Sequence, residues 1–195
     1  MIIGVDFDDV LVNSSETFAA FWNAVHGTSF KKEHFTHHEF HRNWGATPED
    51  VAKMWMRFSK AESHKFTPAA AGAKSMVARL AQFHKLHVVT NRPLETDKET
   101  YQLIDVHFPG IFSDIHFCTK NGGTTRAQLK SDVCRKIGSG IMLEDHPHGA
   151  QQCAADGIHI YLFDQPWNQG AFPLLPGTIV RVSSWQDKIL ETLLP

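Results

Sequence analysis

Met1-Ile-Ile-Gly-Val-Asp6-Phe-Asp8-Asp9-Val10-Leu11-Val12 is the stretch that decides the fold. A short apolar run with β-branched residues is typical of a buried strand of a parallel sheet. The run ends in Asp6 and Asp8, and open α/β sheets bind ligands just outside the carboxyl ends of their strands. Two buried carboxylates this close repel each other, so a divalent cation is expected. Mg²⁺ suits oxygen ligands and sites shared with phosphate. The alternative is a polar turn.

Two later apolar runs also end in polar residues. Residues 86–89 lead into Thr90 and Asn91, and residues 141–143 lead into Glu144 and Asp145. Between these runs, Lys130 begins a predicted helix that Gly138 ends. All of these side chains except that of Lys130 therefore stand at strand ends, where such sheets hold their ligands.

This ordered set of motifs resembles the haloacid dehalogenase-like superfamily over residues 1 to about 164. The acidic residue two positions after Asp6 resembles the phosphatase branch, because dehalogenases lack it. The resemblance implies that Asp6 attacks phosphorus and becomes an aspartyl-phosphate. It implies that Asp8 first protonates the leaving oxygen and then activates water.

The resemblance also implies a metal site. Mg²⁺ would be held by the Asp6 carboxylate, the Asp8 backbone carbonyl and Asp145. Many relatives have a second Asp where this chain has Glu144. The longer Glu144 side chain is therefore expected in the second shell, or to reach the metal through water.

Substrate-binding residues follow from the same resemblance. Thr90 and the amide of Asn91 would bind phosphate oxygens, and a lysine would neutralise the phosphate together with the nucleophile. Three lysines could fill this role: Lys120, Lys130 and Lys136. Lys130 is preferred because it stands at a helix start shortly before the strand that carries the acidic pair.

The fold class predicted from the chain is α/β: a Rossmann-like parallel sheet flanked by helices. Strands are expected at 86–89, 115–118, 141–143, 158–163 and 178–182, and helices at 75–83, 95–106, 131–137, 149–156 and 185–194. Residues 1–12 and 73–195 are predicted to form the catalytic core. Residues 13–72 interrupt the alternation and predict a small helical cap after the first strand.

The segment 13–72 contains two predicted helices. Ser14 or Ser15 is expected to cap a helix over 16–26, and Pro48 to begin another that reaches about residue 60. A cap of this kind excludes water and selects the leaving group.

The same segment is rich in aromatic residues, most of which are expected to form its own small core. Phe18, Trp22 and Trp44 are the three predicted to face the substrate. Together with Thr90-Asn-Arg-Pro93 and Asp164-Gln-Pro-Trp-Asn168, this composition is similar to the 5′(3′)-deoxyribonucleotidase-like group. That similarity implies a nucleoside monophosphate whose base stacks on aromatic rings. Residues 166–168 could instead be a structural turn.

Histidines gather in one segment, at His34, His37, His38 and His41. A polar surface is the ordinary interpretation, and a zinc site is the alternative because His37 and His41 would share a helix face. His146 and His148 flank the acidic pair. One of them could contact phosphate or tune Asp145, and the alternative is a loop histidine that is hydrogen-bonded to the backbone.

Composition limits the partners. The 195-residue chain has a net charge of −2 and no basic stretch typical of nucleic-acid polymer binding. We expect no signal peptide and no membrane-spanning run. Its 3 cysteines lack a C-x-x-C arrangement, which indicates reduced thiols in a cytoplasmic protein.

The sequence therefore predicts a Mg²⁺-dependent phosphatase for a small-molecule phosphomonoester, with a nucleoside monophosphate as the favoured substrate. Two alternatives stay open. The substrate could be a non-nucleotide metabolite, or the protein could bind a phosphate ligand without turnover.

Overall fold

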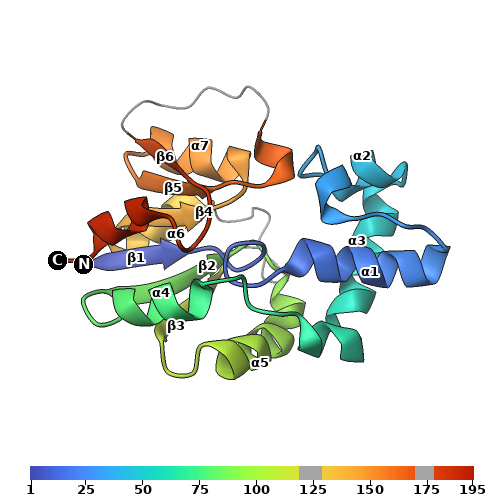
Figure 1. The fold of residues 1–195 in the computed structure, drawn as a ribbon, viewed down its shortest axis with the longest axis horizontal. Coiled ribbons are helices and arrows are strands. Elements are labelled where there is room, and N and C mark those ends of the chain that lie inside the picture. Colours follow the sequence, from blue (N-terminus) through green and yellow to red (C-terminus); the bar gives the residue numbers. More distant parts are fainter. Residues whose placement is uncertain (119–128, 170–177) are drawn as a thin grey trace.

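The computed structural model describes residues 1–118, 129–169 and 178–195. Its centre is a parallel six-stranded sheet with the strand order β3-β2-β1-β4-β5-β6 (Figure 1). The strands are β1 (Ile2–Val5), β2 (Lys85–Thr90), β3 (Phe112–Phe117), β4 (Ser139–Glu144), β5 (His159–Phe163) and β6 (Ile179–Val182). The order reverses between β1 and β4, which is where such sheets bind ligands. The predicted fold class is confirmed.

Helices cover both faces of the sheet. They are α4 (Ala73–Leu80), α5 (Asp97–His107), α6 (Lys130–Ile137) and α7 (Pro147–Ala155). Successive strand residues point to opposite faces, so Val88 packs in the core under α4 and α5 while Val89 packs under α6 and α7. The end of β2, beside β1, is therefore buried on two sides, as its apolar sequence predicts.

The last predicted helix is the main difference from the sequence expectation. In place of a helix over 185–194 the chain has a turn and a short 3₁₀ helix, Lys188–Leu193. The Asp187 carboxylate accepts hydrogen bonds from the amides of Ser183 and Ile189, which favours a turn over continuous helix. Trp185 is held against the first motif, because its Nε1 donates to the Val10 carbonyl at 2.7 Å.

Residues 13–72, called the helical segment below, lie beyond the carboxyl end of β1 (Figure 1). They form α1 (Ser14–His26), α2 (Phe40–Trp44), α3 (Pro48–Ser59) and the 3₁₀ helices Lys32–His34 and Glu62–Phe66. Their buried aromatic residues form a cluster separate from the two cores of the sheet. Within the described ranges, none of the helices is long and apolar enough to cross a bilayer.

The starts of the two predicted helices differ in outcome. α3 begins at Pro48 as expected, and the Thr47 hydroxyl caps it by accepting the Asp50 amide. The predicted capping of α1 by Ser14 or Ser15 is wrong, because both residues lie inside its first turn. Their hydroxyls donate instead to Asp8 and Asp9 of the loop after β1.

Candidate active site

The first acidic residue of the opening motif meets a lysine from another element. Lys130, at the start of α6, places its Nζ 2.9 Å from Asp6 Oδ1 and 2.8 Å from Glu144 Oε2. All three side chains are buried. Of the alternative lysines, Lys136 is exposed on α6 and Lys120 lies outside the described residues.

Carboxylates outnumber ammonium groups in this buried group. Burial raises the pKa of Asp6 to about 8, although the charge of Lys130 opposes the shift. Burial, with the charges of Asp6 and Glu144, raises the pKa of Asp145 well above its ordinary value. Asp6 and Glu144 together raise the pKa of Lys130 against the effect of its burial, so the ammonium stays charged. One cation is therefore too little for this set of carboxylates.

The surplus of buried carboxylate fits a divalent cation. One oxygen each of Asp6, Glu144 and Asp145 lies within 4.8 Å of the others. Carboxylate oxygens are the donors that Mg²⁺ prefers. Glu144 is already engaged, since Oε2 accepts from Lys130 and Oε1 accepts the amides of Asp145 and His146 at 3.1 and 3.0 Å. Both Glu144 oxygens therefore already have protein hydrogen-bond partners.

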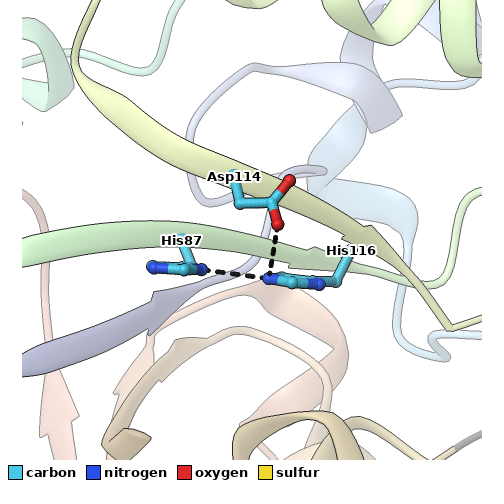
Figure 2. A group of neighbouring side chains, drawn as sticks. All are labelled: His87, Asp114 and His116. Atoms are coloured by element: carbon cyan, nitrogen blue, oxygen red, sulfur yellow. Dashed lines mark hydrogen bonds and ion pairs between the residues drawn. The ribbon is translucent and has the colours of Figure 1, made fainter. Parts of the chain in front are cut away.

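A second set of metal-capable side chains lies elsewhere among the described residues. It consists of His87, Asp114 and His116 on strands β2 and β3 (Figure 2). The histidines of segment 34–41 belong to neither set. The helix that would have aligned His37 with His41 begins only at Phe40, so the structure does not support the zinc alternative.

Asp145 is held by residues whose role the sequence analysis left open. Trp167 Nε1 donates to Asp145 Oδ2 at 3.0 Å. Asn168 Nδ2 donates to the Asp145 carbonyl at 2.8 Å and to the Phe163 carbonyl at 2.7 Å. Residues 166–168 form a short 3₁₀ helix, Pro166–Asn168, whose side chains position the acidic residue after β4.

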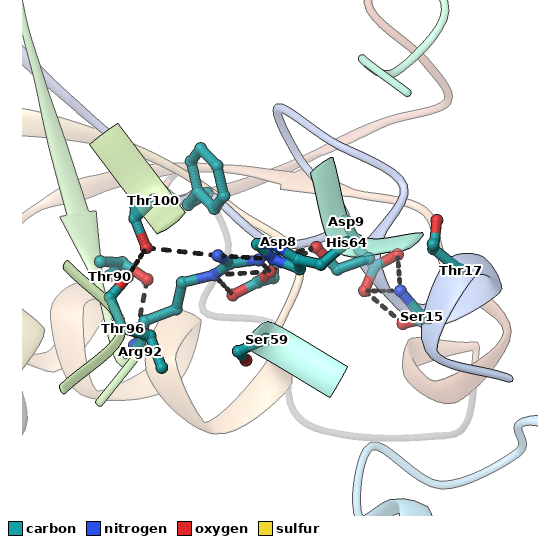
Figure 3. Close-up of polar contacts among 12 residues, drawn as sticks. Asp8, Asp9, Ser15, Thr17, Ser59, His64, Thr90, Arg92, Thr96 and Thr100 are labelled. Carbon is teal, nitrogen blue, oxygen red and sulfur yellow. Dashed lines mark hydrogen bonds and ion pairs between the residues drawn. The ribbon is translucent and has the colours of Figure 1, made fainter. Parts of the chain in front are cut away.

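Asp8 is gripped by Arg92, whose role the sequence analysis missed (Figure 3). Arg92 Nη2 lies 2.7 Å from Asp8 Oδ1 and its Nε lies 3.0 Å from Oδ2. Burial alone would raise the pKa of Asp8. The charge and hydrogen bonds of Arg92, with the Ser14 hydroxyl, outweigh burial and lower it. In this arrangement Asp8 is ionised.

Arg92 is itself held from several sides. Its Nη1 donates to Thr100 Oγ1 at 3.2 Å and lies 3.2 Å from His64 Nε2 (Figure 3). Its guanidinium carbon lies over the Phe7 ring, 4.4 Å from the ring centroid. Burial and the Arg92 charge lower the pKa of His64 to about 4, so its ring is neutral at neutral pH. In the sequence, only the position of Arg92, two residues after Thr90, indicated that this arginine belongs to the site.

Asp9 completes the loop in an uncommon backbone conformation. Its φ of 58° lies in the left-handed region, which costs a non-glycine residue of the order of 1 kcal/mol. Its carboxylate accepts from the amide and hydroxyl of Ser15 and lies 3.5 Å from Lys32 Nζ. These contacts join the loop after β1 to the helical segment.

These side chains open into a pocket of about 610 Å³ between the sheet edge and the helical segment. Thr90 and Asn91 line it on the sheet side, as expected. Its other wall is mostly apolar and includes Phe40, Val51, Trp55 and Met56. The volume falls in the range of small-molecule sites.

The prediction that Phe18, Trp22 and Trp44 face the substrate is wrong. All three are buried in the aromatic cluster of the helical segment and do not line this pocket. The Phe18 ring contacts Trp22 at 6.5 Å and Trp44 at 5.2 Å between ring centroids. The aromatic rings on the pocket wall are those of Phe40, Trp55 and Trp167. Aromatic residues occur throughout the sequence of the helical segment, so the sequence could not separate the buried rings from those that line the pocket.

The histidines beside Asp145 contact the helical segment. His146 Nδ1 accepts the Gly149 amide at 3.3 Å and caps α7, which is the backbone-bonding alternative. The His38 ring packs edge-on against His146 at 4.4 Å and lies 6.0 Å from His148. His38 and His146 therefore bridge the pocket's two walls.

Comparisons with solved structures identify the fold. The protein tyrosine kinase A of Mycobacterium tuberculosis matches with a TM-score of 0.72 at 13% identity, over 100% of this chain and 98% of that chain. CbbY from Rhodobacter sphaeroides, in complex with phosphate, gives 0.62 at 15% over 96% and 95%. The HAD-hydrolase YfnB from Bacillus subtilis, bound to magnesium, gives 0.59 at 15% over 100% and 98%. At these identities the likeness shows the fold alone.

Sequence comparisons identify the family. A thiamine-phosphate synthase of Salinibacter ruber (strain DSM 13855 / M31) is 29% identical over 100 residues, which are 49% of this chain and 44% of that protein. The chain thus spans less than half of that curated relative. The model of the 5′ nucleotidase, deoxy (pyrimidine), cytosolic type C proteins matches residues 1–193. Because this match covers the sheet, the helical segment and every acidic site residue, the chain belongs to that family.

Proposed function

We propose that this protein is a cytoplasmic Mg²⁺-dependent phosphomonoester hydrolase that acts on nucleoside monophosphates through an aspartyl-phosphate on Asp6. The observation that carries the proposal is the contact between Lys130 and Asp6 at 2.9 Å, inside a buried carboxylate group at the base of the pocket. An anionic nucleophile needs such a fixed cation to approach an anionic phosphate. The family's description as a cytosolic nucleotidase supports the substrate and the compartment.

Phosphoryl transfer would begin at Asp6. Its carboxylate oxygen forms a bond to phosphorus while the bond from phosphorus to the ester oxygen breaks. Lys130 holds the carboxylate in place and offsets charge on the phosphate, and Thr90 and the Asn91 amide donate to phosphate oxygens. Asp6, Asp145 and the Asp8 carbonyl would hold Mg²⁺, which supplies further positive charge at the phosphate.

Asp8 would move the protons. It gives one to the leaving ester oxygen and then takes one from the water that hydrolyses the aspartyl-phosphate. Arg92 keeps Asp8 ionised, which suits the second step. The first step needs a protonated Asp8, so the Arg92 contact has to loosen when substrate enters.

The aromatic rings of the pocket wall suit a leaving group that carries a planar base. Phe40 and Trp55 present nearly parallel rings, with centroids 6.4 Å apart and planes 16° apart. A base stacked on an aromatic ring contributes roughly 1–3 kcal/mol. A sugar phosphate gains little from such a wall, which is why nucleotides are favoured over other small phosphomonoesters.

The test measures Mg²⁺-dependent phosphate release from deoxyribo- and ribonucleoside monophosphates, sugar phosphates and an aryl phosphate, with Asp6→Asn as the blank. We expect turnover of nucleotides that Asp6→Asn abolishes. Activity confined to sugar phosphates would overturn the nucleotide assignment and keep the mechanism. Unchanged phosphate release by Asp6→Asn would overturn the mechanism, and tight phosphate binding without turnover would favour a binding protein.

A further inference from the structure

A group of polar side chains sits on one face of the sheet, away from the pocket. His87 of β2 is the register partner of Asp114 on β3, and His116 stands two residues further along β3. Alternate residues of a strand, and register partners on neighbouring strands, point to the same face. All three side chains therefore gather on the face that α6 and α7 cover elsewhere, at the β3 edge of the sheet (Figure 2).

The spacing of the donor atoms suits one small ion. His87 Nδ1 lies 3.0 Å from His116 Nε2, and His116 Nε2 lies 3.7 Å from Asp114 Oδ2. Donors at the Zn–N distance of about 2.0–2.1 Å in a tetrahedral site stand about 3.4 Å apart. The two observed distances lie on either side of that value, and one donor atom of each of the three side chains lies within 4.8 Å of the others.

The chemistry of the donors selects the ion. Imidazole suits Zn²⁺ and its neighbours in the transition series, whereas Mg²⁺ prefers sites made of oxygen alone. His87 and His116 are partly buried and Asp114 is more than half exposed, so the group is open to solvent and to incoming metal.

From this geometry we propose that His87, Asp114 and His116 form a second metal site, which binds Zn²⁺ through two imidazoles and one carboxylate. Water completes the coordination, as in other sites with three protein ligands. This site is separate from the acidic group at Asp6, with a different donor set and a different metal preference. The charge of Lys85 on the same strand acts on His87 and reduces the affinity for a cation.

The experiment is a calorimetric titration of the full-length protein with Zn²⁺ at neutral pH, after metal removal and in excess Mg²⁺ to occupy the acidic group. We expect one Zn²⁺ per chain. His87→Gln and His116→Gln should each weaken binding by on the order of tenfold or more, because each removes one of three ligands. Lys85→Gln should tighten binding by a few-fold, since it removes a repelling charge.

Two further variants keep the result interpretable. Asp114→Asn changes an exposed side chain and so preserves the fold while weakening Zn²⁺ binding. His37→Gln, an exposed histidine of the helical segment, should leave binding unchanged. Absence of Zn²⁺ binding to the wild-type chain would overturn the proposal. So would unchanged affinity in the His87→Gln, His116→Gln double variant.

Discussion

The carboxyl ends of the strands and the helical segment face each other across one pocket, but different forces hold the side chains of the two walls. On the sheet edge, Asp6, Asp8 and Asp145 are each gripped by a named donor. On the opposite wall, Trp55 and Phe40 are placed by ring packing within an apolar cluster. The residues at the strand ends set the charge of the site, and the residues of the helical segment set the shape of the pocket. Changes in the first should therefore alter rate and ionisation, and changes in the second should alter which substrate binds.

The largest effect should come from Lys130→Met. Removing the cation leaves Asp6 and Glu144 buried without their partner, which costs about 3–5 kcal/mol of unfolding free energy and abolishes turnover. Urea unfolding measures the loss. Lys136→Met on the same helix is the matched control, and as an exposed change it should stay within about 0.5 kcal/mol of wild type. Equal losses in both variants would contradict the special role of the buried lysine.

Asp8→Asn should lower kcat for nucleotides by roughly 10²–10⁴-fold, because proton transfer at the sheet edge is lost. The single-turnover rate of Asp6 phosphorylation should fall less with an aryl phosphate, whose leaving oxygen needs no proton. Rapid-quench assays with both substrates measure this. A loss of the same size for both leaving groups would argue against Asp8 as the proton donor.

Arg92→Gln should shift the pH dependence. Arg92 lowers the pKa of Asp8, so without it Asp8 holds its proton to higher pH. Because hydrolysis of the aspartyl-phosphate needs the ionised carboxylate, the acid limb of the kcat profile should move upward. Arg92→Lys, which keeps the charge without the paired contacts, should move it less. An acid limb that stays in place would show that Asp8 does not act as the base.

The smallest effect on rate should come from the opposite wall. Trp55→Leu should raise KM for nucleotides by about tenfold through lost stacking and leave kcat and sugar-phosphate KM nearly unchanged. Trp22→Leu is the comparison, since Trp22 is buried in the helical segment away from the pocket. It should lower the melting temperature without changing KM. If Trp22→Leu raised KM and Trp55→Leu did not, Trp22 and not Trp55 would be the ring that contacts the substrate.

The strands around the site were predictable because their signals are local. Apolar runs that end in Asp6, Thr90 and Asp145 show both the strands and their polar ends. The choice of Lys130 rested on its place at a helix start, and it is the described lysine that reaches Asp6. The starts of helices were harder to predict. The serines expected to cap α1 instead donate hydrogen bonds to the loop after β1.

What the sequence determined by itself is the sheet, the order of its motifs and the acidic chemistry at its edge, because hydrophobic periodicity and strand-end residues are read along the chain. Only the tertiary structure decided that Arg92 grips Asp8 from 84 positions away and that Trp167 holds Asp145. It alone decided that Trp55 and not Trp22 lines the pocket. These outcomes depend on strand register and on how helices pack, which bring distant residues together and leave no pattern at any fixed spacing.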